Sequence, residues 1–265
     1  MDDRNGMSMF DPDLAQRLHN ALTSGNEELF RAITDPAMEV LNAVLKNPLL
    51  DEAHLLIFLK RRDLTEKLLK SLQRLPQVTE SHKLKVALVH NPNTPEEILL
   101  SLLPQLFLFE LATVLFLPGI APDLKYATER AIILRLTGTP LGNKITLARR
   151  GTSGVVGALL KEGDPVLVAA CLANPRLREV DILQFLNGPT ATAETISTVA
   201  RHNRWQSRLN LKLAILKNQK TPLVWHSVFL PTLPLNEIKN LLTSRSMTGA
   251  AKREVVAELK RRGLR

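Results

Sequence analysis

Cysteine is almost absent from this chain of 265 residues, which contains only Cys171. A single cysteine cannot form a disulfide within the chain, and it cannot supply the several thiolates of a zinc or iron–sulfur site. Cys171 lies in the apolar segment VLVAACLANP, where a cysteine usually packs as a small hydrophobic residue. We therefore expect Cys171 to be a core residue and not a nucleophile, since nothing near it in the sequence would lower its pKa.

Motifs of catalysis and metal binding are also absent. No two histidines stand four residues apart, and neither an H-E-x-x-H nor a G-x-S-x-G motif occurs. The sequence therefore predicts no metal and no cofactor, and it favours a protein without catalytic activity. The six histidines are expected to lie on the surface or in packing positions: His19, His54, His82, His90, His202 and His226.

No hydrophobic run is long enough to span a membrane. The most apolar segment, residues 106–120, is shorter than the roughly 20 residues that a span needs, and Glu110 interrupts it. A buried helix is the expected structure there. The first residues, MDDRNGMSMFDPD, carry acids where a signal peptide would carry bases. We expect a cytoplasmic protein with no membrane span.

Aromatic residues make up only 4% of the chain, whereas leucine is abundant throughout. Leucine favours helix because it loses little rotamer freedom there. Apolar residues do not alternate with polar ones at a period of two, so no sheet is expected. The sequence predicts an all-α fold of about 14 to 16 short helices, given ordinary helix lengths.

An internal repeat is visible when residues 84–106 are placed over residues 211–233. Nine positions are identical at an offset of 127 residues, which is about three units of 42. An Asn-Pro or related motif recurs with its first position at residues 47, 91, 136, 174 and 218. The spacings of 44, 45, 38 and 44 residues fall in the range of HEAT-type repeats. They predict about five helical units with a period of about 44 residues.

The repeated motif, which reads Asn-Pro-x-Thr-Pro in residues 91–95, predicts a tight corner between two helices. Asparagine tolerates the left-handed conformation common after a helix, and the proline stops that helix. Thr94 is expected to cap the next helix with its hydroxyl, and Glu97 to complete a capping box. Asp164 followed by Pro165 predicts a helix start of the same kind.

This corner resembles that of leucine-rich-repeat-variant proteins, and the unit length resembles HEAT repeats. The chain departs from the variant family in its longer period and in lacking that family's cysteine-ligated cluster. The resemblance implies an α-solenoid, in which stacked units leave an extended surface for a protein partner. We expect an N-terminal helical cap in residues 1–35, HEAT-like repeats in residues 36–233 and basic capping helices in residues 234–265.

Positive charge is concentrated near the C-terminus. The chain carries a net charge of +9, whereas residues 201–265 alone hold 14 Lys/Arg and 3 Asp/Glu, a net charge of +11. Such asymmetry indicates an acidic partner. Basic residues interleaved with an aromatic one can hold phosphates and stack a base, although the tryptophan can equally pack between repeats. The candidate residues for binding an anion or a nucleic acid are Arg149, Arg150, Arg201, His202, Arg204, Trp205, Arg208 and Lys212.

Three functions follow from these features. The first is a non-enzymatic scaffold that binds protein partners, and the second is a nucleic-acid or ribonucleoprotein binder that uses the basic quarter. The third is a HEAT-like DNA glycosylase, which needs a carboxylate beside a flipped base. The basic quarter offers only Glu237, Glu254 and Glu258, and none adjoins a tryptophan in the sequence.

Overall fold

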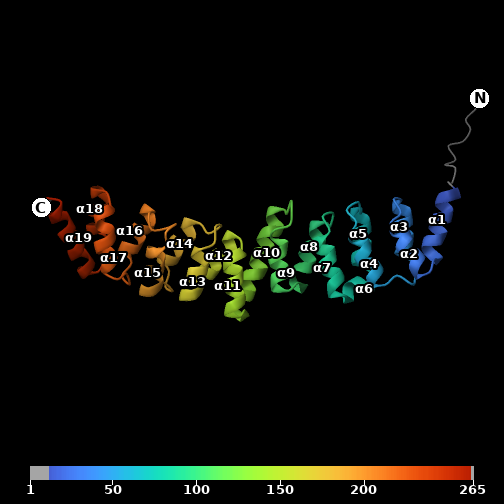
Figure 1. Ribbon diagram of the computed structural model, residues 1–265, viewed down its shortest axis with the longest axis horizontal. Coiled ribbons are helices and arrows are strands. Elements are labelled where there is room, and N and C mark those ends of the chain that lie inside the picture. The colour runs from blue at the N-terminus through green and yellow to red at the C-terminus, as the bar shows by residue number, and fades with distance from the viewer. Residues whose placement is uncertain (1–11, 264–265) are drawn as a thin grey trace, which may run out of the picture. The chain divides into compact units, whose positions relative to one another are not determined.

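Helices form all of the regular structure between residues 12 and 263, the part of the chain that the computed structural model describes (Figure 1). This part contains 19 α-helices and three 3-10 helices, and it contains no strand. The all-α prediction is confirmed. The number of helices exceeds the predicted 14 to 16 because corners follow one another closely and most helices have only seven to nine residues. Within the described helices, none has both the length and the apolar composition to cross a bilayer.

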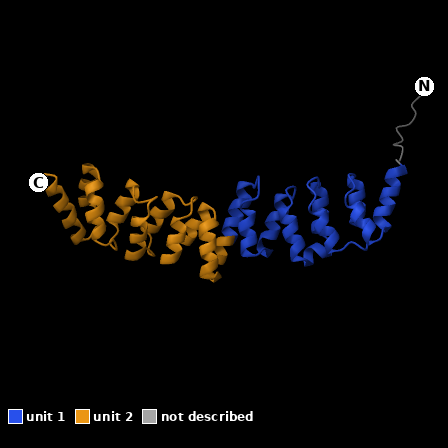
Figure 2. Ribbon diagram, in the orientation of Figure 1, with its two compact units in different colours: residues 1–131 blue, residues 132–265 orange. Residues whose placement is uncertain are grey.

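The chain forms two compact units, residues 1–131 and 132–265 (Figure 2). Helix α10 (Pro122–Arg135) contains the division between them. The boundaries expected from the sequence, at residues 35 and 233, follow the repeat motif and stay a prediction. The other helices of unit 1 are α1 (Pro12–Thr23), α2 (Asn26–Ala32), α3 (Met38–Val44), α4 (Glu52–Phe58), α5 (Glu66–Gln73), α6 (Pro76–Glu80), α7 (His82–His90), α8 (Glu96–Leu102), η1 (Leu103–Gln105) and α9 (Leu108–Val114).

Unit 2 continues from the end of α10 with helices of similar length. They are η2 (Leu136–Gly138), α11 (Leu141–Arg150), α12 (Ser153–Leu160), α13 (Pro165–Leu172), α14 (Glu179–Leu186), α15 (Ala193–Arg201), α16 (Leu209–Lys217), α17 (Val224–Phe229), η3 (Leu230–Thr232), α18 (Leu235–Thr243) and α19 (Gly249–Arg261).

The core of each unit consists mainly of leucine side chains that meet between helices close in sequence. In unit 1, α3 packs against α1 and α2, and α7 packs against α4 and α9. In unit 2, α13 packs against α11, α12 and α15. The predicted apolar face of α8 is confirmed, since Ile98, Leu99 and Leu102 are all buried. Each buried leucine contributes roughly 1.5–3 kcal/mol, so these contacts supply most of the stabilisation.

The corners between helices are held by a recurring interaction, which we call a tether. A tether is a side chain in one corner that donates hydrogen bonds to backbone carbonyls of an earlier corner. Asn91 is an example: its Nδ2 donates to the carbonyls of Leu59 (2.8 Å) and Arg61 (2.7 Å). Its Oδ1 accepts from the backbone N–H of Asn93 (3.0 Å), which fixes the turn. Helix ends leave carbonyls without partners, and the tether satisfies them.

Asparagine plays the same part in three other corners. The side chain of Asn47 donates to the carbonyls of Ala21 and Ser24, and that of Asn174 donates to Ala148 and Gly151. Asn218 donates to Leu186. In each case the side-chain oxygen accepts from the N–H two residues later. The Asn of the repeated motif is therefore a link between corners and not only the end of a helix.

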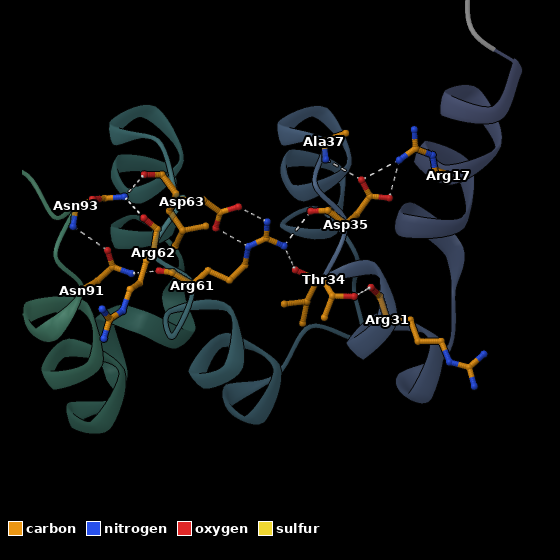
Figure 3. Close-up of polar contacts among 12 residues, drawn as sticks. Arg17, Arg31, Thr34, Asp35, Ala37, Arg61, Arg62, Asp63, Asn91 and Asn93 are labelled. Atoms are coloured by element: carbon orange, nitrogen blue, oxygen red, sulfur yellow. Dashed lines mark hydrogen bonds and ion pairs between the residues drawn. The ribbon is translucent and has the colours of Figure 1, made fainter.

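Arginine and lysine serve as tethers as well. Arg61 occupies the position of Asn91 in the preceding corner, and its guanidinium donates to the carbonyls of Ile33 and Asp35 (Figure 3). Lys220 donates to the carbonyls of Pro189 and Ala191. At the first of these corners in unit 1, Asp35 cannot donate and instead pairs with Arg17 of α1 at 2.9 Å.

Two details of the predicted corner are wrong. The backbone of Asn91 is extended, with φ −73° and ψ 124°, and not left-handed. The Thr94 hydroxyl donates to the carbonyl of Leu88 (2.6 Å), and α8 begins without a side-chain cap. Thr94 therefore satisfies the end of the helix before it, because its buried hydroxyl faces that helix. Thr221 makes the equivalent bond to Ile215. Asp164 does cap α13 as expected, accepting from the N–H of Leu167 at 2.9 Å.

The apolar run of residues 106–120 is not one buried helix, contrary to expectation. It contains the seven-residue helix α9, whose flanking residue Phe107 and member Phe109 are exposed. Glu110 lies near the start of α9, where its carboxylate accepts from the N–H of Phe107 (2.7 Å) and pairs with His82 (2.9 Å). Leu136, in the degenerate copy of the motif, begins the 3-10 helix η2 and has no side-chain donor to act as a tether.

Replacing Asn174, which is 1% exposed, with alanine tests the tether. Asn174→Ala should lower the free energy of unfolding by about 3 kcal/mol, because two helix-end carbonyls and one N–H lose their partner in the interior. Asn203→Ala, at an exposed corner position, should change it by less than about 0.5 kcal/mol. Urea denaturation of both variants measures the difference, and equal effects would contradict the role of the tether.

Candidate functional site

Consecutive corners of unit 2 bring most of the basic candidate residues together. Asn174 ties its corner to the end of α11, where Arg149 and Arg150 lie. Arg204 then ties the next corner to the Asn174 corner, donating from Nη1 to the Asn174 carbonyl at 2.8 Å. Segments far apart in sequence thereby form one edge. We call residues 149–151, 174–178 and 201–208 the basic edge.

Two arginines of this edge were not among the residues expected from the sequence. Arg176 and Arg178 follow Asn174 in its corner and are exposed. Arg178 pairs with Asp181 through two hydrogen bonds of 3.0 Å. The sequence Asn-Pro-Arg-Leu-Arg could have identified these two arginines, because side chains in a corner between helices are commonly exposed to solvent. The edge now holds seven arginines: Arg149, Arg150, Arg176, Arg178, Arg201, Arg204 and Arg208.

Trp205 and Arg204 have a structural part in the edge. Trp205 is 3% exposed, and its indole N–H donates to the carbonyl of Leu172 at 3.2 Å. The Arg204 guanidinium lies 4.3 Å from the centre of the Trp205 ring and also donates to the carbonyls of Pro175 and Leu177. Of the two roles open from the sequence, Trp205 has the packing role. In this structure its ring offers no face on which a base could stack.

The remaining candidate residues divide into engaged and free side chains. Arg201 lies 5.8 Å from the centre of the Trp225 ring, and Lys212 donates to the Thr232 hydroxyl at 2.9 Å. By contrast, Arg149, Arg150 and Arg208 are exposed, and their side chains form no hydrogen bond, ion pair or ring contact with any described residue. These three guanidinium groups can bind an anion without breaking an existing interaction.

The start of α12, which follows Arg149 and Arg150 in the sequence, is not open to an anion in this structure. Thr152, the residue before α12, is buried, and Gly151 is packed so closely that a Cβ there would lie 2.6 Å from the Leu147 carbonyl. Arg149 and Arg150 belong to the last turn of α11. Their charges therefore complement the negative, C-terminal end of the α11 dipole. Any anion that they bind would lie at the surface of the corner and not at the start of α12.

Two histidines of unit 2 have a pKa below the usual value for histidine. Burial lowers the pKa of His226, which is 1% exposed and lies 3.2 Å from the carbonyl of Leu216 through Nε2. Burial, together with the positive charge of Arg204, also lowers the pKa of His202. The lowered pKa favours the neutral form of His202 at pH 7, so His202 adds little to the positive charge of the basic edge.

The cysteine lies in the core of unit 2. Cys171 is fully buried in α13, and its thiol faces the carbonyl of Val156 at 3.7 Å. Burial, with a smaller effect from the charge of Glu162, raises the pKa of the Cys171 thiol to about 12. The thiolate is therefore not formed at neutral pH. Between residues 12 and 263, no three His, Cys, Asp or Glu side chains form a group that could hold a metal ion.

No protein-family model, curated protein sequence or solved structure matches this chain. The resemblance to HEAT and leucine-rich-repeat-variant proteins is therefore carried only by the unit length and the corner motif.

Alanine variants of Arg204 and Arg208 distinguish an arginine with a structural role from one with a free side chain on the basic edge. Arg204→Ala should lower the free energy of unfolding by about 1–2 kcal/mol, because three carbonyls lose a charged donor. Arg208→Ala should leave stability within about 0.5 kcal/mol of the original, since its side chain is free. Thermal and urea denaturation of both variants measure this. Two variants of equal stability would show that Arg204 is not a tether.

Acid should destabilise unit 2 before its carboxylates are protonated. His202 and His226 have a lowered pKa when folded, so the unfolded chain binds more protons once the pH falls below about 6.5. The free energy of unfolding should therefore fall between about pH 7 and pH 5. His226→Gln keeps an N–H donor but does not titrate, so it should lose less stability over the same range. The comparison requires urea denaturation at both pH values, and an identical fall in the two proteins would contradict the assignment.

Proposed function

We propose that this chain is a non-enzymatic binding protein built as an α-solenoid of HEAT-like repeats, about five units with a period of about 44 residues. In this proposal the basic edge binds an acidic protein partner. The observation that carries it is the run of three tethered corners whose first and third members hold Arg149, Arg150 and Arg208, which are exposed and form no side-chain hydrogen bond or ion pair with a described residue.

The recurring tether supports the repeat architecture. Segments 84–106 and 211–233 have the same local structure: a helix, a corner with a tethering Asn, a short helix and a 3-10 turn. Asn91 and Asn218 donate to the carbonyls of corresponding residues, Leu59 and Leu186. Here both the sequence and the hydrogen bonds to the preceding segment recur. This is typical of repeat proteins, in which each unit is stabilised by contacts with the adjacent unit.

Arginine-rich corners suit a carboxylate partner. A guanidinium binds a carboxylate through two parallel hydrogen bonds, and three of them on one edge favour an acidic segment over a single acidic residue. The three segments of the basic edge contain no carboxylate, and Asp181 of α14 already pairs with Arg178. The free charge on this edge is thus positive.

Nucleic acid is the second candidate, favoured by the same free arginines, which bind phosphate as well as carboxylate. The burial of Trp205 argues against a stacking mode for single strands, so contact would be with the backbone. The glycosylase alternative has less support. Glu258, one of its three candidate carboxylates, is 5% exposed and already pairs with Arg261 and Arg262.

Fluorescence anisotropy distinguishes the two partners. The probes are labelled poly-glutamate, and labelled single- and double-stranded RNA and DNA, at low and at moderate salt. The proposal predicts binding of poly-glutamate. The triple variant Arg149→Gln, Arg150→Gln, Arg208→Gln should weaken it by about tenfold or more, given about 0.5–1 kcal/mol for each exposed contact.

The control variant is Lys217→Gln, Lys239→Gln, Arg253→Gln, which removes the same charge from exposed positions outside the edge. It should weaken binding much less. Salt-sensitive binding of nucleic acid but not of poly-glutamate would support the second candidate. If neither polymer binds at low salt, or if both triple variants behave alike, the basic edge is not a binding site.

A further inference from the structure

The corner of unit 1 at residues 117–119 has no side chain that can act as a tether, whereas the Asn91 corner before it has two. Asn91 and Asn93 donate to the carbonyls at four positions of the preceding corner, at distances of 2.7 to 3.1 Å. Arg61 occupies the same place in its corner as Asn91 does in the next one. Relative to Arg61, the four acceptor carbonyls are at positions −2, 0, +1 and +3. They belong to Leu59, Arg61, Arg62 and Leu64. Figure 3 labels Arg61 and Arg62 of this corner together with the donors Asn91 and Asn93.

The same positions accept tethers in unit 2. Relative to Asn174, the acceptor carbonyls are again at positions −2, 0, +1 and +3. Trp205 donates to the first of them, and Arg204 donates to the other three. These carbonyls belong to Leu172, Asn174, Pro175 and Leu177. The Asn174 carbonyl also accepts from the N–H of Leu177 within its own corner, so a turn bond does not prevent a tether.

No side chain among residues 12–263 donates a hydrogen bond to the corresponding carbonyls of the Asn91 corner. The next corner of unit 1 reads Leu117-Pro118-Gly119, which places Leu117 at the position of Asn91 and Gly119 at the position of Asn93. Neither side chain can donate a hydrogen bond. In the Asn91 corner, the residues at positions −2, 0, +1 and +3 relative to Asn91 are Val89, Asn91, Pro92 and Thr94.

A pocket of about 210 Å³ lies at this place. All four of those residues line it, and Leu117 to Ala121 form its other side. Gly119 has φ +71°, and a Cβ added there would meet nothing within 4 Å, so the space belongs to the missing side chains. The pocket is lined by residues of unit 1 alone.

The chain itself indicates the group that would fill the pocket. Arg204 holds three carbonyls of the equivalent set, and at the end of unit 2 Arg262 donates to the carbonyls of Leu230, Pro231 and Leu233 at 2.8 to 3.0 Å. The pocket also has negative charge at its rim, because Glu96 is exposed there and no lysine or arginine lines it.

We propose that this pocket binds an arginine side chain of a partner protein, which supplies in trans the tether that Leu117 and Gly119 cannot supply. The guanidinium donates to the carbonyls of the Asn91 corner, and its alkyl part packs against Leu117 and Leu99. Glu96 then balances the charge. The interaction is independent of the basic edge, which has the opposite charge preference.

The test uses NMR chemical-shift titration of the full chain with the blocked tripeptide Ac-Gly-Arg-Gly-NH2. The matched probe replaces arginine with citrulline, which keeps the shape but removes the charge. Saturable shifts confined to residues 89–96 and 117–121 are expected with the arginine peptide, and binding of the citrulline peptide should be at least about tenfold weaker.

Two variants identify the site. The double variant Leu117→Asn, Gly119→Asn restores the donors and should abolish peptide binding, whereas Leu49→Asn, at an exposed corner leucine beside the tether Asn47, should bind as before. Glu96→Gln, a surface change with little risk to folding, should weaken binding severalfold. Absence of saturable shifts, equal binding of both peptides, or unchanged binding by the double variant and by Glu96→Gln would each overturn the proposal.

Discussion

The constraint on which this structure depends is the need to satisfy backbone carbonyls at the ends of short helices. Each α-helix leaves four carbonyls without an intrahelical partner, and a helix of seven or eight residues leaves half of its carbonyls in that state. Leucine packing cannot satisfy them. Each unit does so with polar side chains from a later corner, so that a tethered corner depends on its neighbour for hydrogen bonds as well as for apolar contact.

This dependence changes how positive charge in the chain is to be understood. Arg61, Arg204 and Arg262 are donors to helix ends, and their role is structural even where they are partly exposed. Arg262 also pairs with Glu258, so the last turn of α19 is fixed to the corner after α17. The charges that remain for a partner are those with no internal bond, above all Arg149, Arg150 and Arg208. Total charge near the C-terminus therefore overstates the surface available for binding.

The sequence predicted the helical class and located the asparagine corners, because their residue types and spacing recur. It placed the Thr94 hydroxyl at the wrong helix, since the spacing of a threonine between two helices suits either end. It also missed the tethers made by Arg61 and Trp205, which do not look like asparagine and whose acceptors lie about 30 residues earlier. The pocket beside Leu117 could not be predicted, because a missing donor becomes visible only when the acceptor carbonyls are located.

Native-state hydrogen exchange of the corner amides tests the tether most directly. The N–H groups of Leu49, Asn93 and Arg176 donate to a tethering asparagine, although they lie in loops. The account predicts that they exchange as slowly as amides in the neighbouring helices, while the N–H of Gly119, in the corner without a tether, exchanges rapidly. Rapid exchange at all four amides would contradict the account, because the corners would then be ordinary loops held only by the apolar core.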